Sequence, residues 1–129
     1  MNLYVTGGRG FEDWSVFSRS FDCLQINSST VRVYYDGDRY MCSMVTHYCS
    51  QKKWEAIRVV PVEDTPYYTH IRNMELMPLI DGALVFWDGK SSEIGKFINL
   101  LRYARKRFVV FDYYGNLVEN YDYDALQSC

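Results

Sequence analysis

Three short polar segments that contain glycine follow apolar runs of the chain. They are Gly7–Gly10, Asp36–Arg39 and Asp88–Glu93. Glycine lets backbone N–H groups come close to a ligand, and the start of a following helix favours an anion. Arg9 and Lys90 can each add a charge-assisted hydrogen bond. The pattern predicts a site for a small phosphate-bearing molecule, and the alternative is that tight strand-to-helix turns require glycine without any ligand.

The cysteines and histidines do not form a metal-binding pattern. Cys23, Cys42, Cys49 and Cys129 contain no Cys-x-x-Cys pair. The steps from Cys42 to His47 and from there to Cys49 do not place all three side chains on one helix face. We therefore expect reduced thiols, no metal and no cofactor. His47 and His70 have no spaced partner, which predicts surface or packing roles for both.

Strand and helix patterns alternate along the chain. Short β-branched or aromatic runs predict strands that are covered on both faces, and they are Leu3–Thr6, Val31–Tyr35, Ala56–Val60, Ala83–Trp87 and Phe108–Phe111. Apolar residues at helical spacing predict helices from Trp14 to Leu24, Tyr40 to Lys52, Ile71 to Met77, and from a cap at Ser91 or Ser92 to Ala104.

This alternation predicts an α/β fold, with a five-stranded, mainly parallel sheet and helices on both of its faces. The segment Asp112–Val118 is typical of a turn into a short strand at the edge, so a C-terminal hairpin is expected. A chain of 129 residues fits one domain, which we expect to span residues 1–129.

Composition and charge exclude several classes of protein. With 48% hydrophobic and 23% charged residues, the chain is too apolar to be disordered. The formal net charge of −2 argues against a nonspecific partner made of DNA or RNA. No run approaches the roughly 20 apolar residues of a membrane span, and the first residues lack a signal-peptide pattern, so a cytoplasmic location is expected.

Three segments together resemble a known family. They are Val5–Phe11, Ile71–Met77 and Asp81–Ser91. In order and spacing they are similar to the signature segments of the YspA-type, cpYpsA-related branch of the SLOG superfamily, which also includes the lonely-guy phosphoribohydrolases and DprA. The resemblance covers residues 3–112 and implies a Rossmann-like sheet that binds nucleotides or nucleotide-derived ligands at the loops named above.

The resemblance also implies which residues bind the ligand. Those that match the family motifs are Gly7, Gly8, Arg9, Gly10, Arg72, Asn73, Asp88, Gly89, Lys90 and Ser91. The positions of Asp36 and Ser92 in the strand-end loops add these two residues to the expected ligand-binding set. The chain departs from the family in two places. Asp36–Arg39 stands where a glycine-rich turn is usual, and Glu93-Ile94 stands where the family has Gly-Thr.

The second departure is similar to the Glu-Ile-Gly segment of nucleoside 2-deoxyribosyltransferases. That likeness implies a nucleophilic role for Glu93 toward the anomeric carbon of a sugar. A carboxylate suits this role because glycosidic cleavage passes through an oxocarbenium-like state. The alternative is that Glu93 only stabilises a helix N-terminus.

Three classes of function follow. The first is a sensor or sequestering protein that binds a nucleotide-derived molecule, in a bacterium or in a phage that intercepts a host signal. The second is an N-glycosidase or deoxyribosyltransferase that uses Glu93, assisted by Asp36, Asp38 or Asp88. The third is a protein-binding module with the tyrosine-rich segment Asp112–Asp124 as its surface. A homodimer is expected from the family resemblance, and because Trp14, Phe17, Phe97 and the tyrosines supply more apolar surface than one small sheet readily covers.

Overall fold

A computed structural model describes residues 1–122 of the chain and contains a six-stranded sheet. Its order is β3-β2-β1-β4-β5-β6, and every neighbouring pair is parallel except β5 and β6. The strands are β1 (Asn2–Gly7), β2 (Arg32–Tyr35), β3 (Glu55–Arg58), β4 (Gly82–Phe86), β5 (Arg107–Phe111) and β6 (Leu117–Tyr121). This confirms the α/β fold with a mainly parallel sheet and an antiparallel strand added at one edge.

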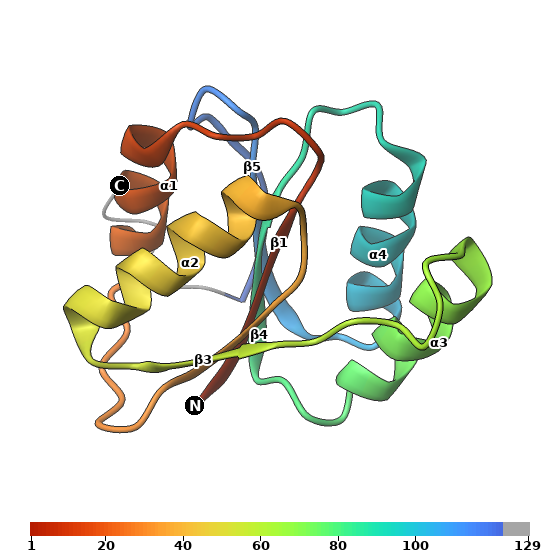
Figure 1. Cartoon of the computed structure of the whole chain (residues 1–129), viewed down its shortest axis with the longest axis horizontal. Coiled ribbons are helices and arrows are strands. Elements are labelled where there is room, and N and C mark those ends of the chain that lie inside the picture. The colour runs from red at the N-terminus through yellow and green to blue at the C-terminus, as the bar shows by residue number, and fades with distance from the viewer. Residues whose placement is uncertain (123–129) are drawn as a thin grey trace.

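Within residues 1–122, four helices cover the two faces of the sheet. They are α1 (Trp14–Asp22), α2 (Arg39–Lys52), α3 (Pro66–Leu76) and α4 (Ser92–Tyr103). Figure 1 shows α1 and α2 together on one side of the strands and α3 and α4 on the other. The sheet is therefore the middle layer of three. A helical crossover follows each of the strands β1 to β4, whereas a turn connects β5 to β6.

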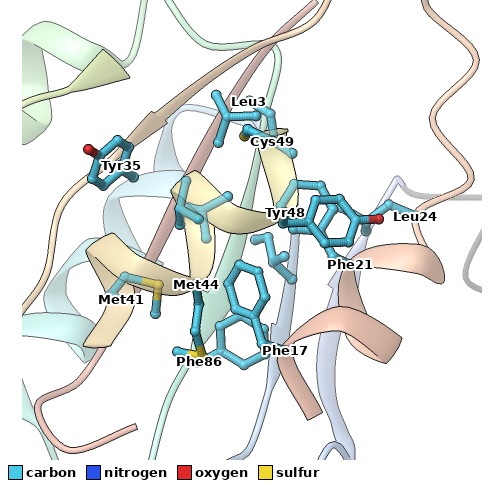
Figure 2. Close-up of a cluster of buried hydrophobic side chains, with 14 of the residues drawn as sticks. Leu3, Phe17, Phe21, Leu24, Tyr35, Met41, Met44, Tyr48, Cys49 and Phe86 are labelled. Atoms are coloured by element: carbon cyan, nitrogen blue, oxygen red, sulfur yellow. The ribbon is translucent and has the colours of Figure 1, made fainter. Parts of the chain in front are cut away.

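Successive residues of the central strands face opposite helical layers, as the period of two requires. Leu3 and Val5 pack with α1 and α2, whereas Tyr4 between them packs with α3 and α4. Figure 2 shows the first of these cores, in which Phe17, Phe21 and Tyr48 cluster over the sheet. Both faces of the central strands are buried, which explains why their sequences are continuously apolar.

Side-chain caps determine where three of the helices begin. Asp13 accepts a hydrogen bond from the Val16 amide at the start of α1, and Asp38 does the same for two amides at the start of α2. Thr65 caps α3, and Pro66 follows it in the first turn. This helix begins five residues before the predicted Ile71, because Thr-Pro provides a cap and a preset φ.

The β1–β4 boundary is the point from which the strand order runs in opposite directions. The chain proceeds from β1 outward to β2 and β3, then returns to place β4 on the other side of β1. Loops that follow β1 and β4 therefore diverge at this position and leave a crevice between them. No helix within residues 1–122 is long and apolar enough to cross a membrane.

Candidate functional site

A cleft of about 1040 Å³ opens where the carboxyl ends of the first four strands meet. We call it the carboxyl-edge cleft. Among its lining residues, those predicted from the sequence are Gly7, Gly8, Arg9, Asp36, Arg72, Asn73, Asp88, Ser91, Ser92 and Glu93. The loops after β1 and β4 thus border one cleft, and the amide of Gly8 donates a hydrogen bond to the Phe86 carbonyl at 3.3 Å. The predicted residues Gly10, Gly89 and Lys90 do not line it.

The glycines of the first loop have packing and turn roles. A Cβ at Gly7 would lie 2.7 Å from the methyl group of Met41, and a Cβ at Gly8 would collide with the hydroxyl of Tyr113. Gly10 and Gly89 have φ values of +82° and +79°, which strongly favour glycine. Close packing at Gly7 and Gly8, and turn conformation at Gly10 and Gly89, therefore account for these glycines without reference to a ligand.

Asp38 ties the first loop to the start of α2. One carboxylate oxygen accepts hydrogen bonds from the amides of Tyr40 and Met41, at 3.1 and 3.2 Å. The other accepts a hydrogen bond from the amide of Gly10 at 3.0 Å, across 28 residues of sequence. A negative charge at this position is stabilised by the helix dipole.

Arg72 forms the centre of a half-buried polar network beneath the cleft. Its guanidinium pairs with Asp36, donates to the Val59 carbonyl at 3.2 Å, and donates twice to the Asn73 side-chain oxygen. It also lies 5.9 Å from the ring centre of Tyr4. Arg72 therefore fixes the ends of β2 and β3 against α3, and most of its donors are already used.

Tyr4 places a phenol at the base of the cleft, and the side chain is 1% exposed. Burial raises the pKa of this phenol to about 12, although the nearby Arg72 opposes the shift. The hydroxyl stays protonated at neutral pH and can donate a hydrogen bond.

The loop after β4 is organised by a second aspartate. One oxygen of Asp88 accepts hydrogen bonds from the amides of Lys90 and Ser91, both at 2.8 Å. These bonds, the one from Ser91 first, hold the pKa of Asp88 below its usual value. Ser91 stands at the N-cap of α4, as predicted, but its side chain makes no capping hydrogen bond. Glu93 follows in the first turn, exposed at the wall of the cleft.

The side chains that line the cleft carry more negative than positive charge. The carboxylates are Asp36, Asp38, Glu63, Asp64, Asp88 and Glu93, and the guanidinium groups are Arg9, Arg58 and Arg72. Arg9 and Arg58 form no ion pair with any residue in the range 1–122. Arg9 and Arg58 can therefore pair with a ligand that has one anionic group, whereas the excess of carboxylates would repel a polyphosphate.

One complete wall of the cleft was not predicted from the sequence. Arg58, the segment 60–64 and Thr69 line it from the end of β3 and the start of α3. The position of this segment directly after a predicted parallel strand could have indicated it, because all segments that follow parallel strands lie at the same edge of the sheet. It was missed because this segment contains no glycine.

Tyr113 was predicted as part of an exposed protein-binding surface, but it packs inward. Its ring lies 5.0 Å from that of Phe11, and its buried hydroxyl has no hydrogen-bond partner within residues 1–122. Burial, and then the charges of Asp88 and Asp38, raise the pKa of this phenol. Tyr114 is exposed, and Tyr123 and Asp124 of the predicted surface lie outside the described residues.

The histidines lie away from the cleft. The ring of His47 packs 4.8 Å from that of Trp14, and His70 is exposed on α3. No group of three or more His, Cys, Asp or Glu side chains between residues 1 and 122 is arranged to hold a metal ion. The cleft offers carboxylates, guanidinium groups, hydroxyls and the carboxamide of Asn73 as its polar side chains.

Comparisons of the chain with protein-family models, with curated proteins and with solved structures find no match.

Proposed function

We propose that the protein binds a nucleotide or a nucleotide-derived small molecule in the carboxyl-edge cleft, as a sensor or sequestering protein. The observation that carries this proposal is the position of the cleft at the switch point between β1 and β4. Ligands of open α/β sheets bind at such points. A volume of about 1040 Å³ is at the upper end of the range typical of small-molecule sites.

The polar groups suit a sugar with free hydroxyls. Asp36 directly follows β2, the position from which a carboxylate accepts hydrogen bonds from a ribose in dinucleotide-binding folds. Its two oxygens accept one bond each, from the Gly37 amide and from Arg72. A carboxylate has about four acceptor positions, so Asp36 keeps capacity for a ligand diol.

Binding without turnover is favoured over catalysis by the environment of Glu93. A glycosidase of this kind needs a general acid for the leaving base. Both histidines lie outside the cleft, and amide hydrogen bonds hold the pKa of Asp88 below its usual value, which disfavours the protonated form that a general acid requires. Enzymatic cleavage is the second candidate, because Glu93 and Asp88 both line the cleft. A role as a protein-binding module is the third, and it is supported by the exposed residues of β6.

The proposal is tested by native mass spectrometry of the purified protein, before and after denaturation, together with calorimetric titration of nucleosides, nucleotides, cyclic nucleotides and ADP-ribose. We expect one member to bind and to be recovered intact. The matched variant is Glu93→Gln, which keeps the shape of the side chain but removes its charge. Release of free base by the wild type, abolished in Glu93→Gln, would replace the binding proposal with the glycosidase.

A further inference from the structure

The inner part of the carboxyl-edge cleft lies on the face of the sheet that α3 and α4 cover. Tyr4 and Thr6 both point to this face, because they are two residues apart on β1 and Tyr4 packs with α3 and α4. Figure 1 shows these two helices together on one side of the strands. The cleft-lining residues from β1, α3 and α4 that are at least nine-tenths buried are Tyr4, Thr6, Asn73, Ile94 and Phe97. We call this part of the cleft the inner compartment.

The inner compartment combines apolar walls with a few uncharged polar groups. Ile94 and Phe97 supply apolar surface from α4, and the ring of Phe97 packs edge-on against that of Tyr4, with ring centres 5.2 Å apart. The polar groups are the hydroxyls of Tyr4 and Thr6 and the carboxamide of Asn73. Such a lining is typical of sites for small organic ligands. Because none of the five side chains is charged, the compartment suits the base of a nucleotide better than its phosphate.

Arg72 determines which way the carboxamide of Asn73 points. Two nitrogens of the guanidinium donate to the Asn73 side-chain oxygen, at 3.2 and 2.7 Å. A guanidinium has no acceptor, so the reversed carboxamide would place N–H groups against N–H groups. Arg72 is itself held by Asp36 and by the Val59 carbonyl. The oxygen of Asn73 is therefore occupied, and its NH₂ group is the end that can meet a ligand.

The NH₂ group of Asn73 is an unpaired donor in a nearly buried residue. Neither of its N–H groups makes a hydrogen bond with residues 1–122, although Asn73 is only 8% exposed. The side-chain atom of these residues that is fully buried without a partner is the Tyr113 hydroxyl and not this nitrogen, so the nitrogen is reached from the cleft that Asn73 lines. A buried polar group without a partner costs free energy, so these donors indicate an acceptor on a ligand.

On the basis of the function proposed above, we propose that the inner compartment holds the base of the ligand and that Asn73 selects the exocyclic group of this base. Because Arg72 occupies both lone pairs of the Asn73 oxygen, Asn73 can donate to a ligand but cannot accept from it. A carbonyl oxygen on the base accepts from the NH₂ group, whereas an exocyclic amino group would place N–H against N–H. The hydroxyls of Tyr4 and Thr6 rotate to donate or accept, so they do not impose this choice. The ligand class is therefore an oxo base, such as hypoxanthine, guanine or uracil, rather than adenine or cytosine.

The test is calorimetric titration of the wild type with nucleosides that differ at this group, inosine against adenosine and uridine against cytidine. Nucleosides carry no phosphate, so the excess of carboxylates in the cleft acts equally on both members of a pair. We expect the oxo member of each pair to bind at least about tenfold more tightly than the amino member. Equal affinities, or a preference for the amino member, would overturn the inference.

The matched variant is Asn73→Asp, because it keeps an acceptor for Arg72 and exchanges only the NH₂ group for an oxygen. We expect this variant to lose or reverse the preference for the oxo member, with circular dichroism confirming that it is folded. Thr69→Asp is the charge control, because Thr69 lines the cleft from one turn earlier on α3, and it should keep the wild-type ratio of affinities. A ratio that is unchanged in folded Asn73→Asp, or lost equally in Thr69→Asp, would contradict selection by Asn73. If Asn73→Asp does not fold, the wild-type ratios alone decide.

This result is separable from the fate of the proposed function. Equal binding of both members of each pair would remove the selection by Asn73 and leave the nucleotide-ligand site in place. If only nucleotides bind, the 5′-monophosphates of inosine and adenosine provide the same comparison. Absence of binding by every nucleoside, nucleotide, cyclic nucleotide and ADP-ribose would remove both the proposed function and this inference.

Discussion

The carboxyl-edge cleft differs sharply from a smaller hollow near the amino end of β3. That hollow is about 380 Å³ in volume, and its lining includes the aromatic side chains of Phe21, Tyr48 and Trp54, so we call it the aromatic hollow. Two of its polar side chains contact a third residue of the hollow, because the Tyr48 hydroxyl donates to Asp22 and the Lys52 ammonium lies 5.6 Å from the centre of the Tyr48 ring. In the cleft, several carboxylate oxygens retain unused acceptor positions. The comparison teaches that the unused polar groups, rather than the presence of a hollow, mark the candidate site.

The largest expected effect is a loss of folding stability when Tyr48 of the aromatic hollow is replaced. Tyr48 is buried and stacks on Phe21 with ring centres 4.1 Å apart, so Tyr48→Ala should lower the free energy of unfolding by about 3–5 kcal/mol. Tyr48→Phe keeps the stack and loses only the hydrogen bond to Asp22, so it should cost about 1–2 kcal/mol. Urea titration measures both values. Loss of ligand affinity in folded Tyr48→Phe would show that the aromatic hollow has a binding role.

The next prediction distinguishes a residue that supports the structure of the cleft from a residue that only contacts the ligand. Arg72→Ala leaves Asp36 without its half-buried partner and should cost about 2–4 kcal/mol of unfolding free energy, with ligand affinity reduced as well. Arg32→Ala is the control, because its ion pair with Glu55 is exposed and should contribute less than about 1 kcal/mol. Equal costs for the two variants in chemical denaturation would contradict the positioning role of Arg72.

A smaller effect concerns binding alone. Arg9 is exposed at the rim of the cleft, so Arg9→Ala should weaken a phosphate-bearing ligand by about 1.5–3 kcal/mol and leave the free energy of unfolding unchanged. Lys96→Ala, an exposed cation on α4 outside the cleft, serves as the charge control. If both variants bind as the wild type does in calorimetry, Arg9 does not contact the ligand.

The smallest effect is a dependence of stability on pH at the loop after β4. Hydrogen bonds from the amides of Ser91 and Lys90 lower the pKa of Asp88 in the folded state. A lowered folded pKa gives stabilisation that is complete above the unfolded pKa and is lost as the pH falls through the folded pKa. Asp88→Asn should therefore have a slightly lower Tm than the wild type at pH 7, and the difference should disappear well below about pH 4. A Tm difference that is constant over this range would contradict the role of the charge.

The strands could be predicted from the sequence because they are buried on both faces. The continuous apolar runs Val31–Tyr35 and Phe108–Phe111 match the observed strands to within one residue at each end, whereas the predicted Ala56–Val60 ends two residues after β3. The start of α3 was placed too late because Tyr67 and His70 are exposed and interrupt the apolar pattern. The signal that gives its start is the Thr65-Pro66 pair, which acts through the backbone rather than through hydrophobicity.

The homodimer prediction depended partly on aromatic residues. The sequence pattern does not show whether such residues are exposed or buried in the core. Phe17 and Phe97 were expected to contribute surplus apolar surface, but each lies in the core of the protomer. The homodimer stays a prediction, and it must use other residues. Exposed apolar side chains on and near α3 include Tyr67, Met74 and Leu79.

The loops that form the cleft could be predicted better than the charges and hydrogen bonds within it. The rule that parallel strands end at one edge brings the loops after β1, β2 and β4 together, and the structure places them around one cleft. The hydrogen bond from Gly10 to Asp38 spans 28 residues, so no local pattern shows that the amide is occupied. The sequence predicted a phosphate at these glycines, whereas the folded chain provides carboxylates there.

The most direct test is a ¹⁵N-edited NMR titration of the wild type with nucleosides, nucleotides, cyclic nucleotides and ADP-ribose. We predict that one of these compounds shifts the backbone signals of Gly7–Arg9, Asp36–Asp38 and Ser91–Glu93 together, because these segments line the same cleft. The signals of Phe21 and Trp54 in the aromatic hollow should stay in place. Shifts confined to the aromatic hollow, or no shift at the three loops with any compound, would contradict the assignment of the cleft as a nucleotide-ligand site.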